Sequence, residues 1–206
     1  MKFGGVVGLA SIAFLALGLT GLAPALAARA DQSYAPVGAK TTPPVGYVEF
    51  CRQQPGSCGA PTGDARDIVL NKQAMRDLKA VNDQVNAAIV PVTDADLYGR
   101  VEVWAFPTKG KGDCEDYVLL KRRMLMDAGW PASALLITVV RDRKGDGHAV
   151  LMVKTDRGEF VLDNQEAEIR DWRMTGYRYV KRQSQQDPNV WVSLGDTQTT
   201  PVVAAR

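Results

Sequence analysis

Apolar residues recur at helical spacing in the segment from about Asp64 to Val90. The apolar stripe consists of Leu78, Val81, Val85, Ala88 and Ile89. Steps of three and four residues place these side chains on one face of a helix, with charged residues on the other faces. Pro91 follows directly, and the residue before a proline is disfavoured in a helix. The pattern therefore predicts an amphipathic helix that ends before Pro91.

A second helix is predicted from Cys114 to about Ala128. Asp113 precedes it, and an aspartate at this position can accept hydrogen bonds from the unpaired N–H groups of the first turn. Asp116, three residues further on, resembles the reciprocal half of a capping box. Gly129 suits the C-terminal cap, and Pro131 prevents the helix from continuing.

Short runs of β-branched and aromatic residues follow the second helix and are typical of strands. They cover residues 135–140, 148–153, 158–163, 177–180 and 190–192. The turn Thr155-Asp156-Arg157-Gly158 lies between the second and third runs and predicts a hairpin. Because the helices come first and the strands afterwards, the chain is predicted to be an α+β protein with an antiparallel sheet.

The first thirty residues do not belong to this pattern. Lys2 provides a basic start, and an apolar run from Phe3 to Leu22 follows it. Small-residue patterns end at Ala27 and at Ala30, and signal peptidase cleaves after such patterns. Residues 1–30 are therefore predicted to be a secretory signal peptide, cleaved at one of these two points. A retained membrane anchor is the alternative, because the apolar run is nearly long enough to span a bilayer.

The rest of the chain is sufficient for one domain. The full sequence has 206 residues, of which 46% are hydrophobic and 23% are charged. Residues 31–46 are rich in Pro, Gly, Thr and Ala and are predicted to form an extended leader. The domain is predicted over residues 47–195, and residues 196–206 are predicted to be a flexible tail.

The charge of the mature chain excludes one class of partner. Cleavage after Ala30 removes Lys2 and Arg29, so that the 25 basic residues fall to 23 and equal the 23 acidic ones. A neutral protein offers no electrostatic reason to bind nucleic acid. The signal peptide indicates a mature form that does not span the membrane and resides in the periplasm or outside the cell, where disulfides persist.

The three cysteines divide by their spacing. Cys51 and Cys58 flank a Pro-Gly turn, and a disulfide between them would close a small loop. Two free thiols are the alternative. A zinc site is poorly supported, because the single histidine and the odd cysteine do not complete a standard ligand set. Cys114 is left unpaired, and a free thiol in an oxidising compartment needs a reason to exist.

Cys114, His148 and Asp163 form the inventory of a thiol nucleophile, a base and a group that orients the base. The unpaired N–H groups at a helix start stabilise a thiolate and could hold the oxyanion of a tetrahedral intermediate. A hairpin symmetric about residues 155–156 would make His148 and Asp163 direct cross-strand neighbours. Each residue also has a structural interpretation, as a small buried side chain, a loop histidine and a turn aspartate.

Three carboxylates surround the candidate nucleophile. Asp113 and Glu115 are adjacent to Cys114 and Asp116 is two residues away, and their negative charge disfavours the thiolate. A bound cation would relieve this conflict, and carboxylates on a tight turn are hard oxygen ligands suited to Ca²⁺. A solvated acidic first turn is the alternative, since helices favour acidic residues there. No organic cofactor is indicated.

Several motifs together resemble the bacterial transglutaminase-like cysteine peptidases. They are Gly112-Asp113-Cys114-Glu115-Asp116-Tyr117, His148-Ala149-Val150-Leu151, Val161-Leu162-Asp163-Asn164, the Cys51 and Cys58 pair, and Trp104 with Pro107. The resemblance covers roughly residues 45–195 and implies a papain-like core with Cys114 as nucleophile, His148 as base and Asp163 as orienter. It also implies a calcium site that matches Asp113, Glu115 and Asp116. Asn164-Gln165 departs from the apolar residue expected after Asp-Asn in this family.

The resemblance further implies a function. The best-known members of the family are periplasmic proteases that release large surface adhesins and so control biofilm attachment, and an inner-membrane receptor for a cyclic dinucleotide sequesters them. We therefore expect a secreted cysteine endopeptidase with a protein substrate. A transglutaminase or amidase on the same triad is one alternative, because an amine rather than water would then resolve the acyl-enzyme. A non-catalytic binding module that retains the scaffold is the other.

Overall fold

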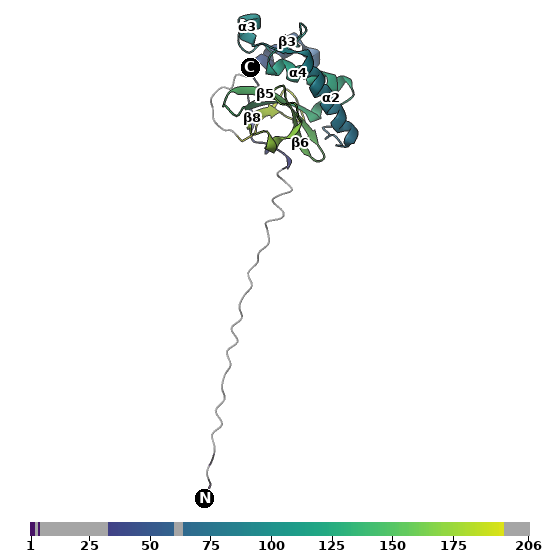
Figure 1. The fold of residues 1–206 in the computed structure, drawn as a ribbon. Coiled ribbons are helices and arrows are strands. Elements are labelled where there is room, and N and C mark those ends of the chain that lie inside the picture. Colours follow the sequence, from purple (N-terminus) through teal and green to yellow (C-terminus); the bar gives the residue numbers. More distant parts are fainter. Residues whose placement is uncertain (3, 5–32, 60–63, 196–206) are drawn as a thin grey trace.

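The computed structural model describes residues 1–2, 4, 33–59 and 64–195 (Figure 1). The predicted tail and nearly all of the predicted signal peptide lie outside these residues. The described residues contain four α-helices: α1 (Val45–Gln53), α2 (Lys72–Ala88), α3 (Asp94–Tyr98) and α4 (Cys114–Asp127). They also contain the 3₁₀ turns η2 (Pro55–Ser57), η3 (Ala132–Ala134) and η4 (Trp172–Met174).

A seven-stranded antiparallel sheet forms the second layer, in the order β1-β9-β8-β4-β5-β6-β7. Its strands are β1 (Lys40–Thr41), β4 (Leu135–Arg141), β5 (Gly147–Thr155), β6 (Gly158–Leu162), β7 (Arg170–Asp171), β8 (Arg178–Gln183) and β9 (Trp191–Ser193). The strands β2 (Val90–Pro91) and β3 (Lys111–Gly112) form a separate parallel pair. The predicted α+β architecture is therefore confirmed, with all five predicted strand runs present.

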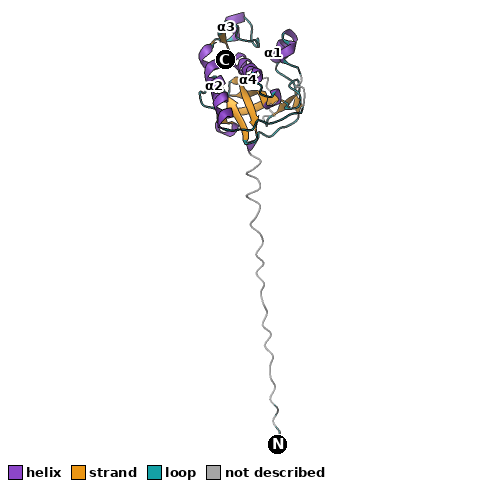
Figure 2. Cartoon of the chain, turned by 90° about the vertical axis from the view of Figure 1, so that its right-hand side faces the viewer, coloured by secondary structure: helices purple, strands orange, loops and turns teal. Residues whose placement is uncertain are grey.

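The helices cover one face of the sheet. Helix α4 packs against β5, and α2 packs against α4. Both views show α2 and α4 beside the sheet (Figures 1 and 2). Alternate residues of a strand point to opposite faces, so Leu151 contributes to the cluster beneath the helices and Met152 to a cluster on the far face. Both side chains are fully buried. Burial on both faces explains why the central strands read as continuous apolar runs.

Helix α2 begins later than the apolar pattern indicates. The pattern extended from about Asp64, whereas the helix starts at Lys72. Asn71 caps it, because its side-chain oxygen accepts from the backbone N–H groups of Gln73 at 2.8 Å and Ala74 at 2.9 Å. The segment before Asn71 instead runs along the sheet, where Ile68 forms a bridge with Thr155.

Helix α4 matches its predicted bounds, but its start is capped differently. The carboxylate of Asp113 accepts no hydrogen bond from the first turn. Its Oδ2 instead accepts from the backbone N–H of Asp94 at 3.3 Å. Asp116 does not complete a capping box either, because its Oδ1 accepts from the N–H of Ala105 at 2.8 Å. Both carboxylates are buried and tie the loop before the helix to its first turn.

The C-terminal end of α4 follows the prediction. Gly129 adopts a φ of +87°, a left-handed conformation that glycine tolerates best. Its N–H donates to the carbonyl of Met126 at 2.9 Å. The N–H of Trp130 then donates to the carbonyl of Leu125 at 3.0 Å, so two otherwise unpaired carbonyl groups are satisfied.

The β5–β6 hairpin has the predicted turn but a different register. Thr155 pairs with Gly158 and Leu151 with Leu162, so the hairpin is symmetric about residues 156–157. The predicted pairing, symmetric about residues 155–156, was therefore wrong by two positions, and His148 and Asp163 are not direct cross-strand partners. A shift of two residues keeps every side chain on the same face, because the pleat has a period of two.

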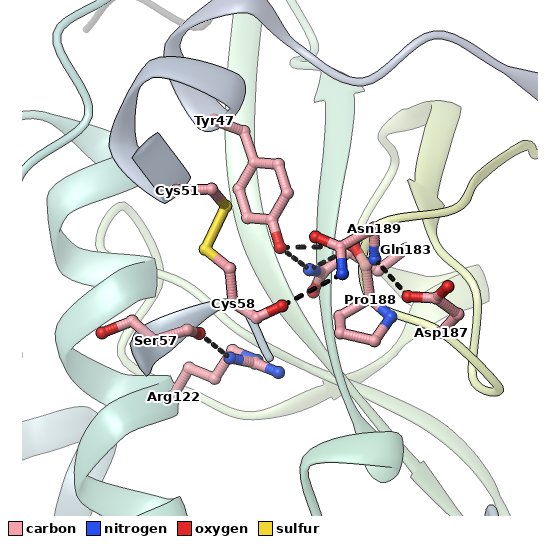
Figure 3. Close-up of a disulfide and its surroundings, with 9 residues drawn as sticks. All are labelled: Tyr47, Cys51, Ser57, Cys58, Arg122, Gln183, Asp187, Pro188 and Asn189. Atoms are coloured by element: carbon pink, nitrogen blue, oxygen red, sulfur yellow. Dashed lines mark hydrogen bonds between the residues drawn. A yellow bond between two sulfur atoms is a disulfide. The ribbon is translucent and has the colours of Figure 1, made fainter. Parts of the chain in front are cut away.

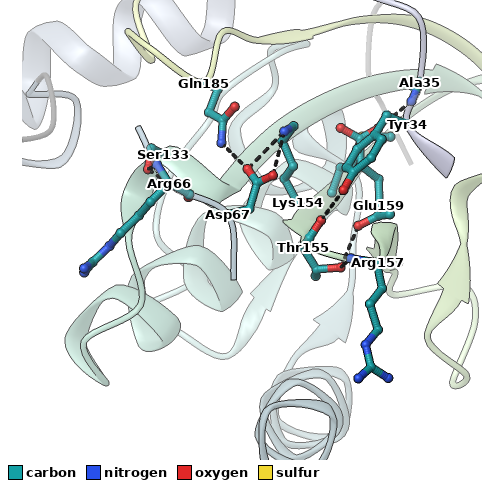
Figure 4. Close-up of polar contacts among 12 residues, drawn as sticks. Tyr34, Ala35, Arg66, Asp67, Ser133, Lys154, Thr155, Arg157, Glu159 and Gln185 are labelled. Atoms are coloured by element: carbon teal, nitrogen blue, oxygen red, sulfur yellow. Dashed lines mark hydrogen bonds and ion pairs between the residues drawn. The ribbon is translucent and has the colours of Figure 1, made fainter. Parts of the chain in front are cut away.

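Part of the predicted leader lies against the sheet (Figure 4). The Tyr34 hydroxyl donates to the carbonyl of Thr155 at 2.9 Å, and the backbone N–H of Ala35 donates to Oε2 of Glu159 at 2.7 Å. Lys154 lies over the Tyr34 ring, 4.8 Å from its centroid. Further along, β1 pairs with β9 at the sheet edge. The segment therefore continues the sheet beyond the predicted domain start.

A disulfide joins Cys51 in α1 to Cys58 after η2, as predicted (Figure 3). Their Cα atoms are 5.6 Å apart. Closing so short a loop stabilises the fold by about 2–3 kcal/mol in the chain-entropy model. The carbonyl of Cys58 also accepts from Nδ2 of Asn189 at 3.1 Å, which links the loop to the segment before β9. Cys114 is the remaining cysteine and is free and buried.

Among the described residues, no helix has both the length and the apolar character needed to cross a membrane.

Candidate active site

Cys114 lies at the first position of α4, where this helix meets strand β5. Its side chain has no exposed surface. The backbone N–H of Ala149 in β5 donates to Sγ at 3.4 Å, and the thiol donates to Oε2 of Glu115 at 3.1 Å. Packing of α4 on β5 therefore places the thiol beside the residue that directly follows His148 in the chain.

His148 and Asp163 are in direct contact. The imidazole of His148 in β5 is fully buried, and its Nε2 lies 2.8 Å from Oδ1 of Asp163, the residue that follows β6. An imidazole nitrogen that contacts a carboxylate carries its proton, so Nε2–H donates to Asp163 and Nδ1 keeps its lone pair. The structure thus brings the three predicted catalytic residues to one place, from the start of α4, from β5 and from the residue after β6.

Asp163 accepts hydrogen bonds from three donors. Besides His148, the backbone N–H of Gln165 donates to Oδ1 at 2.9 Å and the hydroxyl of Tyr177 donates to Oδ2 at 2.5 Å. Burial by itself would raise the pKa of Asp163. The hydrogen bonds from His148, Tyr177 and Gln165 outweigh burial and lower this pKa below its usual value. The carboxylate is therefore anionic near neutral pH.

Tyr177 and Gln165 were not among the predicted site residues. The ring of Tyr177 also meets the His148 ring edge to face, with centroids 5.7 Å apart. The side-chain Nε2 of Gln165 lies 3.4 Å from Nδ1 of His148. The sequence pattern predicted Tyr177 only as the start of a strand. Gln165 differs from the residue expected in the family, but the sequence did not predict its contact with the imidazole.

The thiol and the imidazole have separate hydrogen-bond partners in this structure. Among the described residues, the thiol bonds with Glu115 and Ala149, and the imidazole bonds with Asp163 and Gln165. Catalytic hydrogen bonds are often loose in enzymes without substrate and form only in the complex. The arrangement has the groups needed for acyl transfer. Gln165 contacts Nδ1, the nitrogen that would accept the thiol proton.

Burial raises the pKa of Cys114 well above its usual value, and the negative charges of Glu115 and Asp113 raise it further. The N–H of Ala149 acts in the opposite direction but does not compensate. The conflict between thiolate and carboxylates that the sequence indicated is therefore present in the structure.

A compact group of carboxylates adjoins the thiol, and its membership differs from the predicted set. Asp94, Asp113 and Glu115 each place one oxygen within 4.8 Å of the others. Asp94 begins α3 and was not predicted. Asp116 stands outside this group: its Oδ1 accepts from the N–H of Ala105, and its buried Oδ2 has no hydrogen-bond partner among the described residues.

The donor set of this group fits a hard divalent cation. Asp94, Asp113 and Glu115 are all buried, and Oδ1, Oδ1 and Oε1 of these residues have no hydrogen-bond partner among the described residues. Burial raises the pKa of each carboxyl group, that of Asp113 to about 7. Three buried carboxyl groups with unpaired oxygens match the oxygen ligands that Ca²⁺ prefers.

A buried lysine lies on the same helix as the thiol. Lys121 is two turns along α4 from Cys114 and has no exposed surface. Among the described residues its Nζ has no hydrogen-bond partner, although it lies 5.9 Å from the centre of the Tyr117 ring. Burial lowers its pKa to about 7, and the charge of Asp163 acts in the opposite direction.

Comparisons with known proteins identify the fold and the family. The fold is similar to that of calcium-bound LapG from Legionella pneumophila, with 23% sequence identity over 64% of this chain and 74% of that one, at a TM-score of 0.50. A second LapG structure from this organism has 25% identity over 59% and 70% of the two chains, at a TM-score of 0.49. A comparison with curated proteins returned no match. The family model described as bacterial transglutaminase-like cysteine proteinase BTLCP matches residues 37–199. The chain therefore belongs to this family and is a transglutaminase-like cysteine peptidase.

Proposed function

We propose that this peptidase is a periplasmic endopeptidase that cleaves a protein substrate through Cys114, His148 and Asp163. One observation carries the assignment. The Cys114 thiol lies 3.4 Å from the backbone nitrogen of Ala149, next to a histidine whose Nε2 lies 2.8 Å from Asp163. These contacts support the roles of nucleophile, base and orienting carboxylate for the three residues.

The chemistry follows from the roles of these groups. Nδ1 of His148 accepts the proton of the thiol, and Sγ attacks the carbonyl carbon of the scissile peptide bond. The backbone N–H groups at the start of α4 stabilise the oxyanion, because they have no partner within the helix. The imidazolium then gives its proton to the leaving amine. Asp163 holds the imidazole in position and stabilises its charged form. Water resolves the thioester, with His148 as base.

Asp94, Asp113 and Glu115 would hold a calcium ion beside this centre. Their buried, unpaired oxygens support the assignment, and the LapG structure with the similar fold is calcium-bound. When bound, the ion would supply positive charge next to the thiol and offset the carboxylates that disfavour its ionisation. The two aspartates connect α3 and the start of α4, so the same residues also fix the position of Cys114 in the fold.

The substrate and compartment are proposed from the family and the sequence. The predicted signal peptide supports a periplasmic location. The resemblance to adhesin-releasing family members supports a large surface adhesin as the substrate and an inner-membrane receptor as the regulatory partner. In this proposal the enzyme controls attachment of the cell by releasing the adhesin.

The test compares peptide ends in cells that carry the native protein and in cells that carry Cys114→Ala. Protein N-termini in the released and surface fractions are identified by mass spectrometry. We expect one new internal N-terminus, from a large surface protein, that is present only with the native enzyme. Identical N-termini in both strains would refute the endopeptidase. New isopeptide cross-links without new N-termini would identify an acyl transferase instead.

A further inference from the structure

Gln165 is an exposed residue whose side-chain amide reaches a fully buried imidazole. Its Nε2 lies 3.4 Å from Nδ1 of His148, and its backbone N–H donates to Oδ1 of Asp163 at 2.9 Å. The backbone bond keeps this residue beside the pair of His148 and Asp163. The side chain is free to leave, because its remaining surface faces solvent.

Nδ1 is the nitrogen of His148 through which protons must pass. Nε2 is engaged with Asp163 at 2.8 Å, and Nδ1 has one lone pair in the plane of the ring. The thiol proton arrives at this lone pair, and the same proton is later given to the leaving nitrogen of the substrate. The leaving nitrogen must therefore come within hydrogen-bond distance of Nδ1. The amide N–H₂ of Gln165 now occupies that position and donates to Nδ1, as the N–H of an amine that attacks the acyl-enzyme would.

We propose that Gln165 forms the subsite for the residue on the C-terminal side of the scissile bond and selects the amine that leaves or enters there. This inference rests on the proposed roles of Cys114 and His148. In the free enzyme the carboxamide of Gln165 occupies the position of the amine. When the amine binds, the carboxamide moves aside and lines the subsite.

Aminolysis of the acyl-enzyme measures the amine selectivity of this subsite separately from the acylation step. The nitrogen of an added amine bonds to the thioester carbon, the C–S bond breaks, and its electron pair returns to sulfur. The amine proton passes to Nδ1 of His148 and then to the thiolate. Water competes for the same thioester. The ratio of amide to acid is therefore set after acylation, independently of how fast the acyl-enzyme forms.

The experiment uses N-acetyl-alanine p-nitrophenyl ester as acyl donor, and glycinamide or leucinamide as the amine. Mass spectrometry measures the amide-to-acid ratio for each. We expect Gln165→Ala to raise the preference for leucinamide over glycinamide at least threefold relative to the native enzyme, because the vacated space admits the larger side chain. Gln53→Ala removes an exposed glutamine of α1 and should keep the native preference.

Two further measurements distinguish a failure of the proposed function from a failure of the inference about Gln165. If the native protein shows no acetyl-alanyl adduct by intact mass and releases no more p-nitrophenol than Cys114→Ala, the proposed function fails, and the inference about Gln165 fails with it. If the adduct forms but Gln165→Ala and Gln165→Leu both keep the native amine preference, only the inference about Gln165 is refuted. Gln165→Leu also serves as the second variant if Gln165→Ala does not fold.

Discussion

Nε2 of His148 lies 2.8 Å from Oδ1 of Asp163, although the hairpin register does not pair these two residues. The contact is diagonal across the ends of β5 and β6, and Asp163 is held in place by Tyr177 and by the backbone of Gln165. The orientation of the imidazole thus depends on contacts beyond the hairpin itself.

The first prediction concerns the charge of Asp163. Asp163→Asn removes the anion that holds Nε2–H and stabilises the imidazolium, so kcat/KM should fall by roughly 10²-fold or more. Steady-state kinetics on a peptide that the native enzyme cleaves would measure this loss. Asp127→Asn, at an exposed position of α4, should keep the native rate. Native activity in Asp163→Asn would remove this residue from the mechanism.

Tyr177 is expected to act through Asp163. Tyr177→Phe removes one donor from an anionic carboxylate, so the pKa of Asp163 should rise and kcat/KM should fall by about tenfold. Because a carboxylate with a raised pKa is protonated sooner on acidification, the loss should increase towards low pH. A pH profile of kcat/KM tests this.

Tyr179→Phe provides the matched control. Tyr179 is buried, and its hydroxyl donates to the carbonyl of Trp172 at 3.0 Å rather than to Asp163. Its loss should lower the melting temperature and leave the pH profile native. If both variants show the same pH profile, Tyr177 has only a structural role.

Calcium binding should depend on Asp94 and not on Asp116. Asp94→Asn removes one of three clustered carboxylates and should abolish the heat of Ca²⁺ binding in calorimetric titration. Asp116→Asn keeps an oxygen for the N–H of Ala105 and should bind Ca²⁺ like the native protein. At 100 times the dissociation constant, Ca²⁺ should stabilise the native fold by about 2.7 kcal/mol.

Two outcomes would contradict the calcium site. A native protein that gives neither heat nor a change in melting temperature has no such site. Loss of binding in Asp116→Asn with binding intact in Asp94→Asn would restore the ligand set that the sequence predicted.

Lys121 should make stability depend on pH. Burial lowers its pKa to about 7 in the folded protein, whereas the pKa of a lysine in the unfolded chain is about 10.4. Between these values the unfolded chain binds more protons, so the free energy of unfolding should rise with pH. The rise attributable to Lys121 is of order 1 kcal/mol per pH unit.

Denaturant unfolding between pH 7 and pH 10 tests this expectation on Lys121→Met, which lacks the titrating group. Its free energy of unfolding should rise less steeply than that of the native protein. Lys144→Met, at an exposed turn, should keep the native slope. Equal slopes in all three proteins would mean that Lys121 is not protonated differently in the two states.

Local patterns were sufficient for the elements that carry the site. The bounds of α4 followed from Gly129, Pro131 and the helical segment between them and Cys114, because caps and breakers act within a few residues. The runs that became β5 and β6 and the turn between them were also evident. A disulfide across the Pro-Gly turn and the family motifs completed a prediction of fold and enzyme class that the structure and the comparisons confirm.

Tertiary structure decided the details of the site. A strand pattern of period two cannot distinguish registers that differ by two residues, so the pairing of His148 remained undetermined. Asp94 lies 19 residues before Asp113, and no local spacing connects it to the carboxylate group. Contacts of Tyr177 and Gln165 with the imidazole arise where loops meet across the fold. Chain neighbours set local conformation, whereas packing between distant segments decides which side chains share a site.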